Sequence, residues 1–509
     1  MSSSRRSFLK RLGITGAAFG LPSAACTPTP AHPTGPHVEV TGRVTGPDGG
    51  LEGVPVTDGV SVTQTGADGH YRLASSARRP FVYLSVPAGY QLPTTETGTA
   101  QFYQPLDARD GAATASFALQ PLEQDDTRHA FAFVADPQAR TEAEMDRFRT
   151  ETAPDLQTTM QALDRPAFGV GGGDLVFDDL SLFDNYEAAI EATGLPFVQV
   201  VGNHDLDFAA PVDRGSTAIY REHFGPEYYS FDRGAVHYVV LDDVYWPGQS
   251  GFGRETDGYL GHLDAPQLAW LEHDLALVND GRTVIVLTHI PPLSTLYDRR
   301  GEETQTPTGM IINRSALYEL LDPFDAHIIS GHVHENEHRN AAGLHEHVVG
   351  TACGAWWTGP ICYDGTPSGY AVYDVDGSSV QWHYKSTGHD ANHQMRLYPA
   401  GADPEVPDRF LANVWDADAE WTITWYEDGI QTGEMTRRVG LDPWARHLYD
   451  GDDTPEKHSW IEPQPTAHLY DAPFNPDANR IHVEATDRFG RTYITELDPA
   501  ADPTTGTAG

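Results

Sequence analysis

The sequence predicts a layered α/β domain with small all-β domains on both sides. Three observations lead to this fold class. The chain has 509 residues, which is too many for one hydrophobic core. Between about residues 128 and 385, apolar strand-like runs alternate with segments of helical periodicity, as in layered α/β domains. The regions before and after contain short stretches of alternating polar and apolar residues between Gly, Asp and Pro turns, as in antiparallel β domains.

The N-terminal segment is interpreted as a targeting signal rather than as part of the fold. The pair Arg5-Arg6 precedes a modestly apolar run that is too short to span a bilayer as a stable helix. This pattern resembles signals of the bacterial Tat route, so we expect residues 1–26 to direct export. Ser-Ala-Ala before Cys26 is similar to a lipoprotein cleavage site, although the usual leucine is missing, and attachment of a lipid is an open alternative. The Pro/Thr-rich residues 27–37 would form a tether, leaving the protein periplasmic or membrane-anchored at the cell surface.

The chain is strongly acidic. It contains 33 Lys and Arg against 73 Asp and Glu, which gives a formal net charge of -40. Attraction to phosphate backbones and anionic lipids requires a basic face, so the composition argues against general binding of nucleic acids or anionic membranes. We therefore expect a well-solvated surface without a nucleic-acid-binding face.

The first β domain is expected over residues 38–122. It resembles carboxypeptidase-regulatory or transthyretin-like modules through its Gly-Arg-Val, Gly-Val-Pro-Val and Thr-x-x-Asp-Gly-x-Tyr patterns. Its Asp-Gly pairs are interpreted as turns rather than as calcium ligands. The predicted strands cover residues 38–44, 54–59, 65–73 and 81–86.

The α/β domain is expected over residues 127–390. A helix predicted at residues 265–278 has four aliphatic side chains on one face, and a second helix is predicted at residues 315–321. Residues 228–232 are interpreted as a structural strand. The other predicted strands cover residues 130–135, 167–170, 197–201, 236–241, 283–287 and 327–329.

A second small β domain is expected over residues 395–498, followed by a disordered tail at residues 499–509. Its predicted strands cover residues 414–415, 421–426, 481–485 and 492–494.

Five of the strands predicted for the α/β domain end in side chains that can bind metal. Because ligands bind at the carboxyl ends of strands in α/β sheets, we expect these side chains to converge. Oxygen and imidazole donors suit Mn, Fe, Zn or Co, and two such ions can clamp a phosphoryl group and polarise water. The five strand ends carry Asp136-Pro137-Gln138, Asp174, Asn203-His204-Asp205, His289 and His332-Val333-His334.

The order of these motifs, Asp-x-(His/Gln), Gly-Asp, Gly-Asn-His-Asp, His and Gly-His-x-His, resembles the calcineurin-like metallophosphoesterase family over about residues 131–334. The flanking regions are similar to modules attached to one bacterial branch of that family. The resemblance implies a core with α-β-β-α layers. It also implies an exported, dinuclear metal-dependent enzyme that hydrolyses a phosphomonoester or phosphodiester through metal-activated water.

The resemblance also implies a role for each motif residue. His204 would lie beside the phosphate, where it stabilises charge or protonates the leaving oxygen, and Asp205 would orient His204 or fix the turn. The implied ligands of two divalent ions are Asp136, Gln138 and His334 at the first, Asn203, His289 and His332 at the second, and Asp174 between them.

The chain departs from the usual family pattern at two positions. Gln138 stands where many relatives have histidine, and a neutral amide is a weaker ligand, so the affinity or identity of the first metal is in question. Asp178 follows Asp174 by four residues instead of three. We interpret Asp178 as a loop acid with a helix-capping use.

The loop after the last motif contains Trp356 and Trp357, which could form a wall of the substrate pocket or pack against the C-terminal domain. Cys353 and Cys362 could form a disulfide in an oxidising compartment or remain free buried thiols. His262 is a candidate for phosphate contact. The remaining histidines are interpreted as surface or core residues, among them His223, His237, His345 and His347.

The acidic surface favours a small or lipid-linked phosphate compound over an anionic polymer as the substrate. The alternative function is that of a non-catalytic cell-surface binding protein on a degenerate phosphoesterase scaffold.

Overall fold

A computed structural model describes residues 35–248, 258–302, 304–451, 461–498 and 501–508. The expected export signal, Cys26 and most of the tether lie outside these ranges. Among the described residues, no helix combines the length and apolar character needed to cross a membrane.

The first core sheet has the strand order β12-β11-β10-β21-β22. Its first three strands are parallel, whereas β21 pairs with β10 in the antiparallel direction and carries β22 at the edge. The strands are β10 (Arg128–Val134), β11 (Ala167–Gly171), β12 (Phe197–Gln199), β21 (Gly369–Asp376) and β22 (Ser379–Ser386).

The second core sheet has the order β13-β14-β17-β18-β20-β19, with β14, β17, β18 and β20 parallel. The strand expected near residues 228–232 is its edge strand. The strands are β13 (Tyr229–Arg233), β14 (Val236–Val240), β17 (Thr283–Leu287), β18 (Asp325–Ser330), β19 (Glu337–Ala341) and β20 (Leu344–Val348). A separate short ladder joins β15 (Val244–Tyr245) to β16 (Leu260–Gly261).

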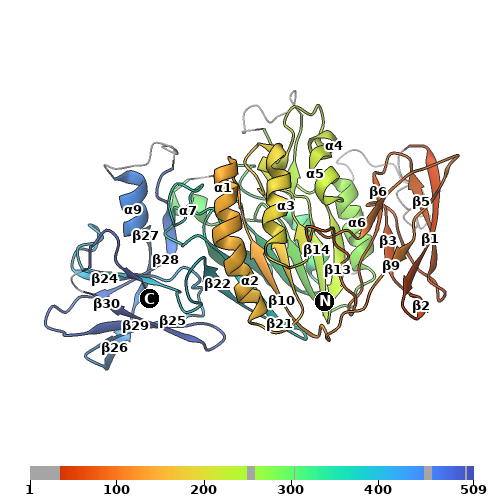
Figure 1. Cartoon of the computed structure of the whole chain (residues 1–509). Coiled ribbons are helices and arrows are strands. Elements are labelled where there is room, and N and C mark those ends of the chain that lie inside the picture. Colours follow the sequence, from red (N-terminus) through yellow and green to blue (C-terminus); the bar gives the residue numbers. More distant parts are fainter. Residues whose placement is uncertain (1–34, 249–257, 303, 452–460, 499–500, 509) are drawn as a thin grey trace, which may run out of the picture. The chain divides into compact units, whose positions relative to one another are not determined.

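The two sheets pack face to face, and helices cover their outer faces (Figure 1). Strand β10 shows why, because successive side chains point to opposite faces of a sheet. Phe131 and Phe133 lie in the apolar cluster between the sheets, where the ring of Phe131 is 5.5 Å from that of Tyr238 in β14. Ala132 and Val134 lie in the cluster formed with helices. The predicted α/β fold class with α-β-β-α layers is thus confirmed.

Helices α1, α2, α3 and α5 pack on the first sheet, and α6 and α8 on the second. In α6 the Asp264 side chain accepts a hydrogen bond from the Gln267 amide at 2.8 Å, a typical N-cap. Helix α6 ends three residues before the predicted end because the chain tightens into i to i−3 bonding, with the Val278 amide donating to Leu275. The helices are α1 (Glu142–Arg147), α2 (Ala153–Gln161), α3 (Phe183–Glu191), α4 (Asp213–Ser216), α5 (Ala218–Phe224), α6 (Ala265–Leu275), α7 (Leu296–Arg299) and α8 (Arg314–Leu321).

The N-terminal β domain consists of two small sheets that share the apolar cluster of the core. One sheet is built around β1, which pairs with β2, β5, β8 and β9, and the other has the order β4-β3-β6-β7. The strands are β1 (His37–Gly46), β2 (Gly49–Gly50), β3 (Pro55–Thr57), β4 (Val62–Gln64), β5 (His70–Ser76), β6 (Phe81–Leu84), β7 (Tyr103–Pro105), β8 (Ala112–Thr114) and β9 (Phe117–Ala118).

The C-terminal β domain also has two sheets, ordered β27-β28-β24-β23-β31 and β26-β25-β29-β30, with an apolar cluster of their own. Helix α9 (Pro443–Asp450) follows β27. The strands are β23 (Arg396–Tyr398), β24 (Arg409–Asn413), β25 (Thr422–Glu427), β26 (Ile430–Glu434), β27 (Thr436–Leu441), β28 (Pro465–Pro473), β29 (Ile481–Thr486), β30 (Thr492–Leu497) and β31 (Thr507–Ala508).

Two expectations about this domain need correction. Val414 and Trp415 were expected in a strand, but the strand is β24, which ends at Asn413. The tail was expected to be disordered, yet β31 pairs with β23 and the Thr505 carbonyl accepts a hydrogen bond from Arg396 at 2.7 Å. The tail lacks large apolar residues, but strand pairing uses backbone groups that composition does not reveal.

Candidate metal centre

The structure brings all seven predicted ligands to one edge of the core, at the ends of β10, β11, β12, β17 and β18. At one end of this group, Asp174, His289 and His332 have donor atoms that all lie within 4.8 Å of one another. The Nε2 atom of His289 lies 3.3 Å from Asp174 Oδ1 and 3.1 Å from Asn203 Oδ1. These four side chains are the set expected around the second ion. Asp174, which is expected between the two ions, also faces the residues expected around the first ion.

The other half contains Asp136, Gln138 and His334. His334 Nε2 lies 3.5 Å from Asp136 Oδ1, and the Gln138 amide donates to Asp174 Oδ2 at 3.0 Å. Asp136 is fully buried, and its Oδ1 atom has no hydrogen-bond donor among the described residues. A buried carboxylate oxygen without a donor is costly, and a cation would satisfy it. The residues present therefore fit divalent ions.

Hydrogen bonds behind the histidines fix which ring nitrogen faces the centre. His289 Nδ1 lies 2.9 Å from the Gly172 carbonyl, and His334 Nδ1 lies 2.9 Å from the Gly354 carbonyl. His332 has the opposite arrangement, with Nε2 3.0 Å from the Thr308 carbonyl. In a neutral imidazole, a ring nitrogen that donates to a carbonyl leaves the other nitrogen unprotonated, as a metal ligand must be.

The backbone around the centre is held in an uncommon conformation. Of the twelve non-glycine residues with positive φ in the described part of the chain, eight lie in these loops. Such residues persist where the surrounding structure enforces them, and they are typical of functional sites. The eight are Asp136, Gln138, Asp174, Asp178, His332, His334, Trp356 and Trp357.

Two motif glycines allow the ligand loops to approach each other. A Cβ atom on Gly202 would lie 1.8 Å from the Asp174 backbone nitrogen, and one on Gly331 would lie 2.5 Å from Asp136 Oδ2. No side chain could be added at either position without moving a ligand.

The charges of the centre favour cations. Burial opposes ionisation of Asp174, but the nearby His289 outweighs it and holds the pKa of Asp174 below its usual range. Burial likewise opposes protonation of His289, and Asp174 outweighs it to raise the pKa of His289 to about 10. Burial and the neighbouring His289 lower the pKa of His332 to about 3. The buried carboxylates of Asp136 and Asp174 thus attract positive charge, which bound metal ions would supply.

His204 lies on the rim of the centre, beside the ligands. Its Nδ1 atom lies 2.7 Å from Asp178 Oδ1, its ring stacks on Phe177 at 4.2 Å, and its backbone amide donates to Asp174 Oδ1. This arrangement leaves Nε2 as the ring atom that can face a substrate.

Asp205, in contrast, belongs to the turn. It is buried and accepts hydrogen bonds from the backbone amides of Gly202 at 2.9 Å and Val176 at 3.2 Å. Two roles were expected for Asp205, to orient His204 or to fix the turn. Its contacts correspond to the second of these roles. Asp178 orients His204, and the helix-capping role expected for Asp178 belongs to Asp179, which accepts from the Ser181 amide. The spacing of Asp178 was noticed in the sequence, but spacing does not reveal its contact.

The two tryptophans lie behind His334. The ring of Trp356 stacks on that of His334 at 4.0 Å and packs against an apolar cluster that includes Tyr449 of α9. Trp357 is buried and donates from Nε1 to the Pro137 carbonyl at 2.9 Å. The contacts of Trp356 follow the packing alternative, whereas Trp357 packs within the apolar cluster of the core. Cys353, which lies 3.8 Å from His334, and Cys362 are both free and buried.

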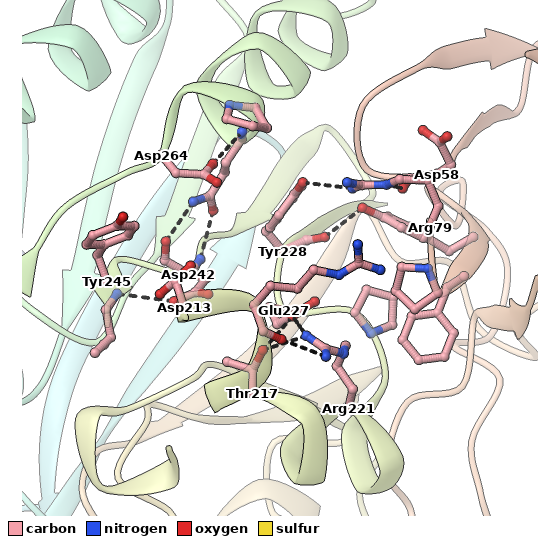
Figure 2. Close-up of a pocket in the computed structure, with 18 of the residues that line it drawn as sticks. Asp58, Arg79, Asp213, Thr217, Arg221, Glu227, Tyr228, Asp242, Tyr245 and Asp264 are labelled. Atoms are coloured by element: carbon pink, nitrogen blue, oxygen red, sulfur yellow. Dashed lines mark hydrogen bonds and ion pairs between the residues drawn. The ribbon is translucent and has the colours of Figure 1, made fainter. Parts of the chain in front are cut away.

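A cavity of about 240 Å³ lies between the N-terminal β domain and the core, and it shares no lining residue with the ligand set (Figure 2). His262 lines this cavity together with Asp213, Asp242 and Asp264. Arg79, Arg214 and Arg221 line the same cavity, so the structure places His262 among charged groups of both signs and apart from the predicted ligands. Burial raises the pKa of Asp213 to about 6.

The layered core and the clustered oxygen and imidazole donors are those of an α/β protein with a candidate metal site. Family models match residues 38–122 (N terminal of Calcineurin-like phosphoesterase), 129–336 (Calcineurin-like phosphoesterase) and 346–493 (C terminal of Calcineurin-like phosphoesterase). The chain therefore belongs to the calcineurin-like phosphoesterase family.

Among curated proteins, the chain is similar to purple acid phosphatase 23 of Arabidopsis thaliana, with 27% identity over 32% of this chain and 36% of that protein. It is also similar to a 3',5'-cyclic-nucleotide phosphodiesterase of Nostoc sp., with 23% identity over 32% of this chain and 53% of that protein. The chain thus spans about a third and about half of these two relatives. A solved purple acid phosphatase from yellow lupin (Lupinus luteus) seeds matches with 14% identity and a TM-score of 0.36, covering 66% of this chain and 67% of that one.

Proposed function

We propose that this chain is an exported metal-dependent phosphoesterase that uses two divalent ions to hydrolyse a phosphomonoester or phosphodiester. The observation that carries the proposal is the convergence of all seven predicted ligands beside His204. Asp136, Gln138 and His334 would hold one ion and Asn203, His289 and His332 the other, with Asp174 shared. When bound, Mn, Fe, Zn or a similar pair would neutralise phosphoryl oxygens and make water more acidic.

The side chains of this centre have distinct tasks in that reaction. A phosphate held at this centre would lie beside His204, whose Nε2 would stabilise charge or give a proton to the leaving oxygen. Asp178 fixes the ring so that Nε2 faces the phosphate. The amide nitrogen of Gln138 points at Asp174. A half-turn of the amide group would present the amide oxygen as a ligand instead.

The relatives support a phosphoester substrate without distinguishing a monoester from a diester. One of them is named as a phosphatase and the other as a cyclic-nucleotide phosphodiesterase. The test is hydrolysis of p-nitrophenyl phosphate and bis-p-nitrophenyl phosphate with Mn, Zn or Fe, before and after chelation. We expect metal-dependent turnover of at least one ester. If the metal-loaded protein cleaves neither of them, nor any of a panel of natural phosphoesters, the non-catalytic binding function replaces the proposal.

Export is the part of the proposal that rests on the sequence alone. The Arg5-Arg6 pair supports the Tat route, and Cys26 supports a lipid anchor. Replacing both arginines by lysine should retain the protein in the cytoplasm, and Cys26→Ser should release it from the membrane fraction. An unchanged distribution of both variants in cell fractionation would contradict this part.

A further inference from the structure

A second cluster of metal-capable side chains lies where the C-terminal β domain meets the core. In the β19–β20 hairpin, His338 pairs directly with His347 across the two strands, so both side chains project from the same face. Their ring centroids are 3.9 Å apart and the rings are tilted by 30°. Two imidazoles on directly paired residues can chelate one ion without any change in the strands.

The third side chain comes from the C-terminal domain. Asp416 lies in the loop after β24, with Oδ1 2.9 Å from His338 Nε2 and 3.9 Å from His347 Nε2. The donor atoms of these three residues all lie within 4.8 Å of one another. Asn336 adds an oxygen, Oδ1, which is 3.2 Å from His347 Nε2. The Asn336 amide nitrogen also donates to Asp416 Oδ1 at 3.0 Å, so Asn336 contacts both an imidazole and the carboxylate of the cluster.

Hydrogen bonds outside the cluster hold these donors in place. The Tyr384 amide donates to the other Asp416 oxygen at 3.0 Å. The Nδ1 atom of His347 meets the Tyr373 hydroxyl, and that of His338 lies 3.3 Å from His345 Nε2. In both rings Nδ1 is engaged outside the cluster and Nε2 points into it. This is the support that metal-binding histidines require.

The environment also suits a metal. The side chains of His338, His347 and Asp416 are 2%, 0% and 1% exposed. Around tetrahedral zinc, ligands at about 2.0–2.2 Å place donor atoms roughly 3.3–3.6 Å apart, which lies between the separations seen here.

We propose that His338, His347 and Asp416, with Asn336 as the fourth donor, form a structural site for a divalent transition metal such as Zn²⁺. The ion would link the β19–β20 hairpin of the core to the C-terminal β domain. Its ligands are separate from those of the phosphoesterase centre, so the site is independent of the proposed activity. The competing arrangement is a junction held by hydrogen bonds alone.

The test compares the metal content of full-length variants purified with Zn²⁺. We expect wild type to hold one ion more per chain than His338→Gln, measured by mass spectrometry of the metal. His327→Gln is the matched control, because His327 lies on the neighbouring strand β18 and contributes no donor to the cluster. It should keep the wild-type content. Equal content in folded wild type and His338→Gln would overturn the proposal.

A second measurement covers the case in which His338→Gln does not fold. Crystals of wild type with Zn²⁺ should show an anomalous peak at the zinc edge within coordination distance of His347 Nε2. The absence of a peak there, in crystals whose phosphoesterase centre is occupied, would establish the metal-free junction.

Discussion

His204 and Asp178 form a hydrogen-bonded pair at the rim of the metal centre, with 2.7 Å between Nδ1 and Oδ1. Asp178→Asn is expected to lower kcat by about tenfold or more, because the amide no longer stabilises a protonated ring or fixes its orientation. KM and metal content should change little. If His204 protonates the leaving oxygen, the loss will be larger for phenyl phosphate than for p-nitrophenyl phosphate, whose leaving group needs no proton.

Asp179→Asn is the matched control for that experiment. Asp179 is the next residue and caps a short helix through the Ser181 amide, so its replacement should leave kcat nearly unchanged. Equal losses in the two variants would show that the loop, rather than the pair, controls the rate.

The difference between ligand and rim positions separates the roles of Asp174 and His204. Asp174→Ala is expected to abolish turnover and to reduce metal content, since Asp174 contacts both halves of the ligand set. His204→Ala should lower kcat by about a hundredfold or more while metal content stays near normal. Metal analysis and kinetics on the same samples test both statements. Loss of both ions in His204→Ala would mean that this histidine is itself a ligand.

Residues that follow their strands directly could be located from the sequence, whereas contacts between distant loops could not. His289 and His332 come just after apolar runs, and the edge of a parallel sheet brings such positions together. The contact between Asp178 and His204 depends on a positive φ of 63° at Asp178, and no local sequence pattern predicts that conformation. Likewise, the pairing of β21 with β10 joins segments that are far apart in the chain. The number of strands in the first sheet could therefore not be predicted from the sequence.

Gln138 would be a weak ligand in the proposed centre, and its replacement by histidine should strengthen metal binding. An imidazole binds Mn, Fe or Zn more tightly than an amide oxygen does, so Gln138→His is expected to slow loss of one ion to a chelator by about tenfold or more. Its positive φ of 39° does not forbid the change, because His332 and His334 also have positive φ. Gln138→Leu keeps a similar volume without a donor atom and should lose that ion faster than wild type. Identical loss rates in all three proteins would exclude Gln138 from the ligand set.

His237 is expected to make the stability of the fold depend on pH. Its ring lies between two carboxylates, with Nδ1 2.9 Å from Asp232 Oδ1 and Nε2 3.0 Å from Asp274 Oδ2. Burial disfavours the charged ring, but Asp274 and Asp232 outweigh it and raise the pKa of His237 to about 9. Because this pKa is above the unfolded value of about 6.5, the charged ring stabilises the fold fully below pH about 6.5. That contribution, about 3 kcal/mol by linkage, is lost as the pH rises through about 9.

His237→Gln should therefore lower the melting temperature strongly at pH 6 and only slightly at pH 9.5, measured by calorimetry on full-length protein. His273→Gln, on the exposed face of α6, is the control and should melt like wild type at both pH values. A His237→Gln deficit of the same size at pH 6 and pH 9.5 would mean that packing of the ring, and not its charge, is what stabilises the fold.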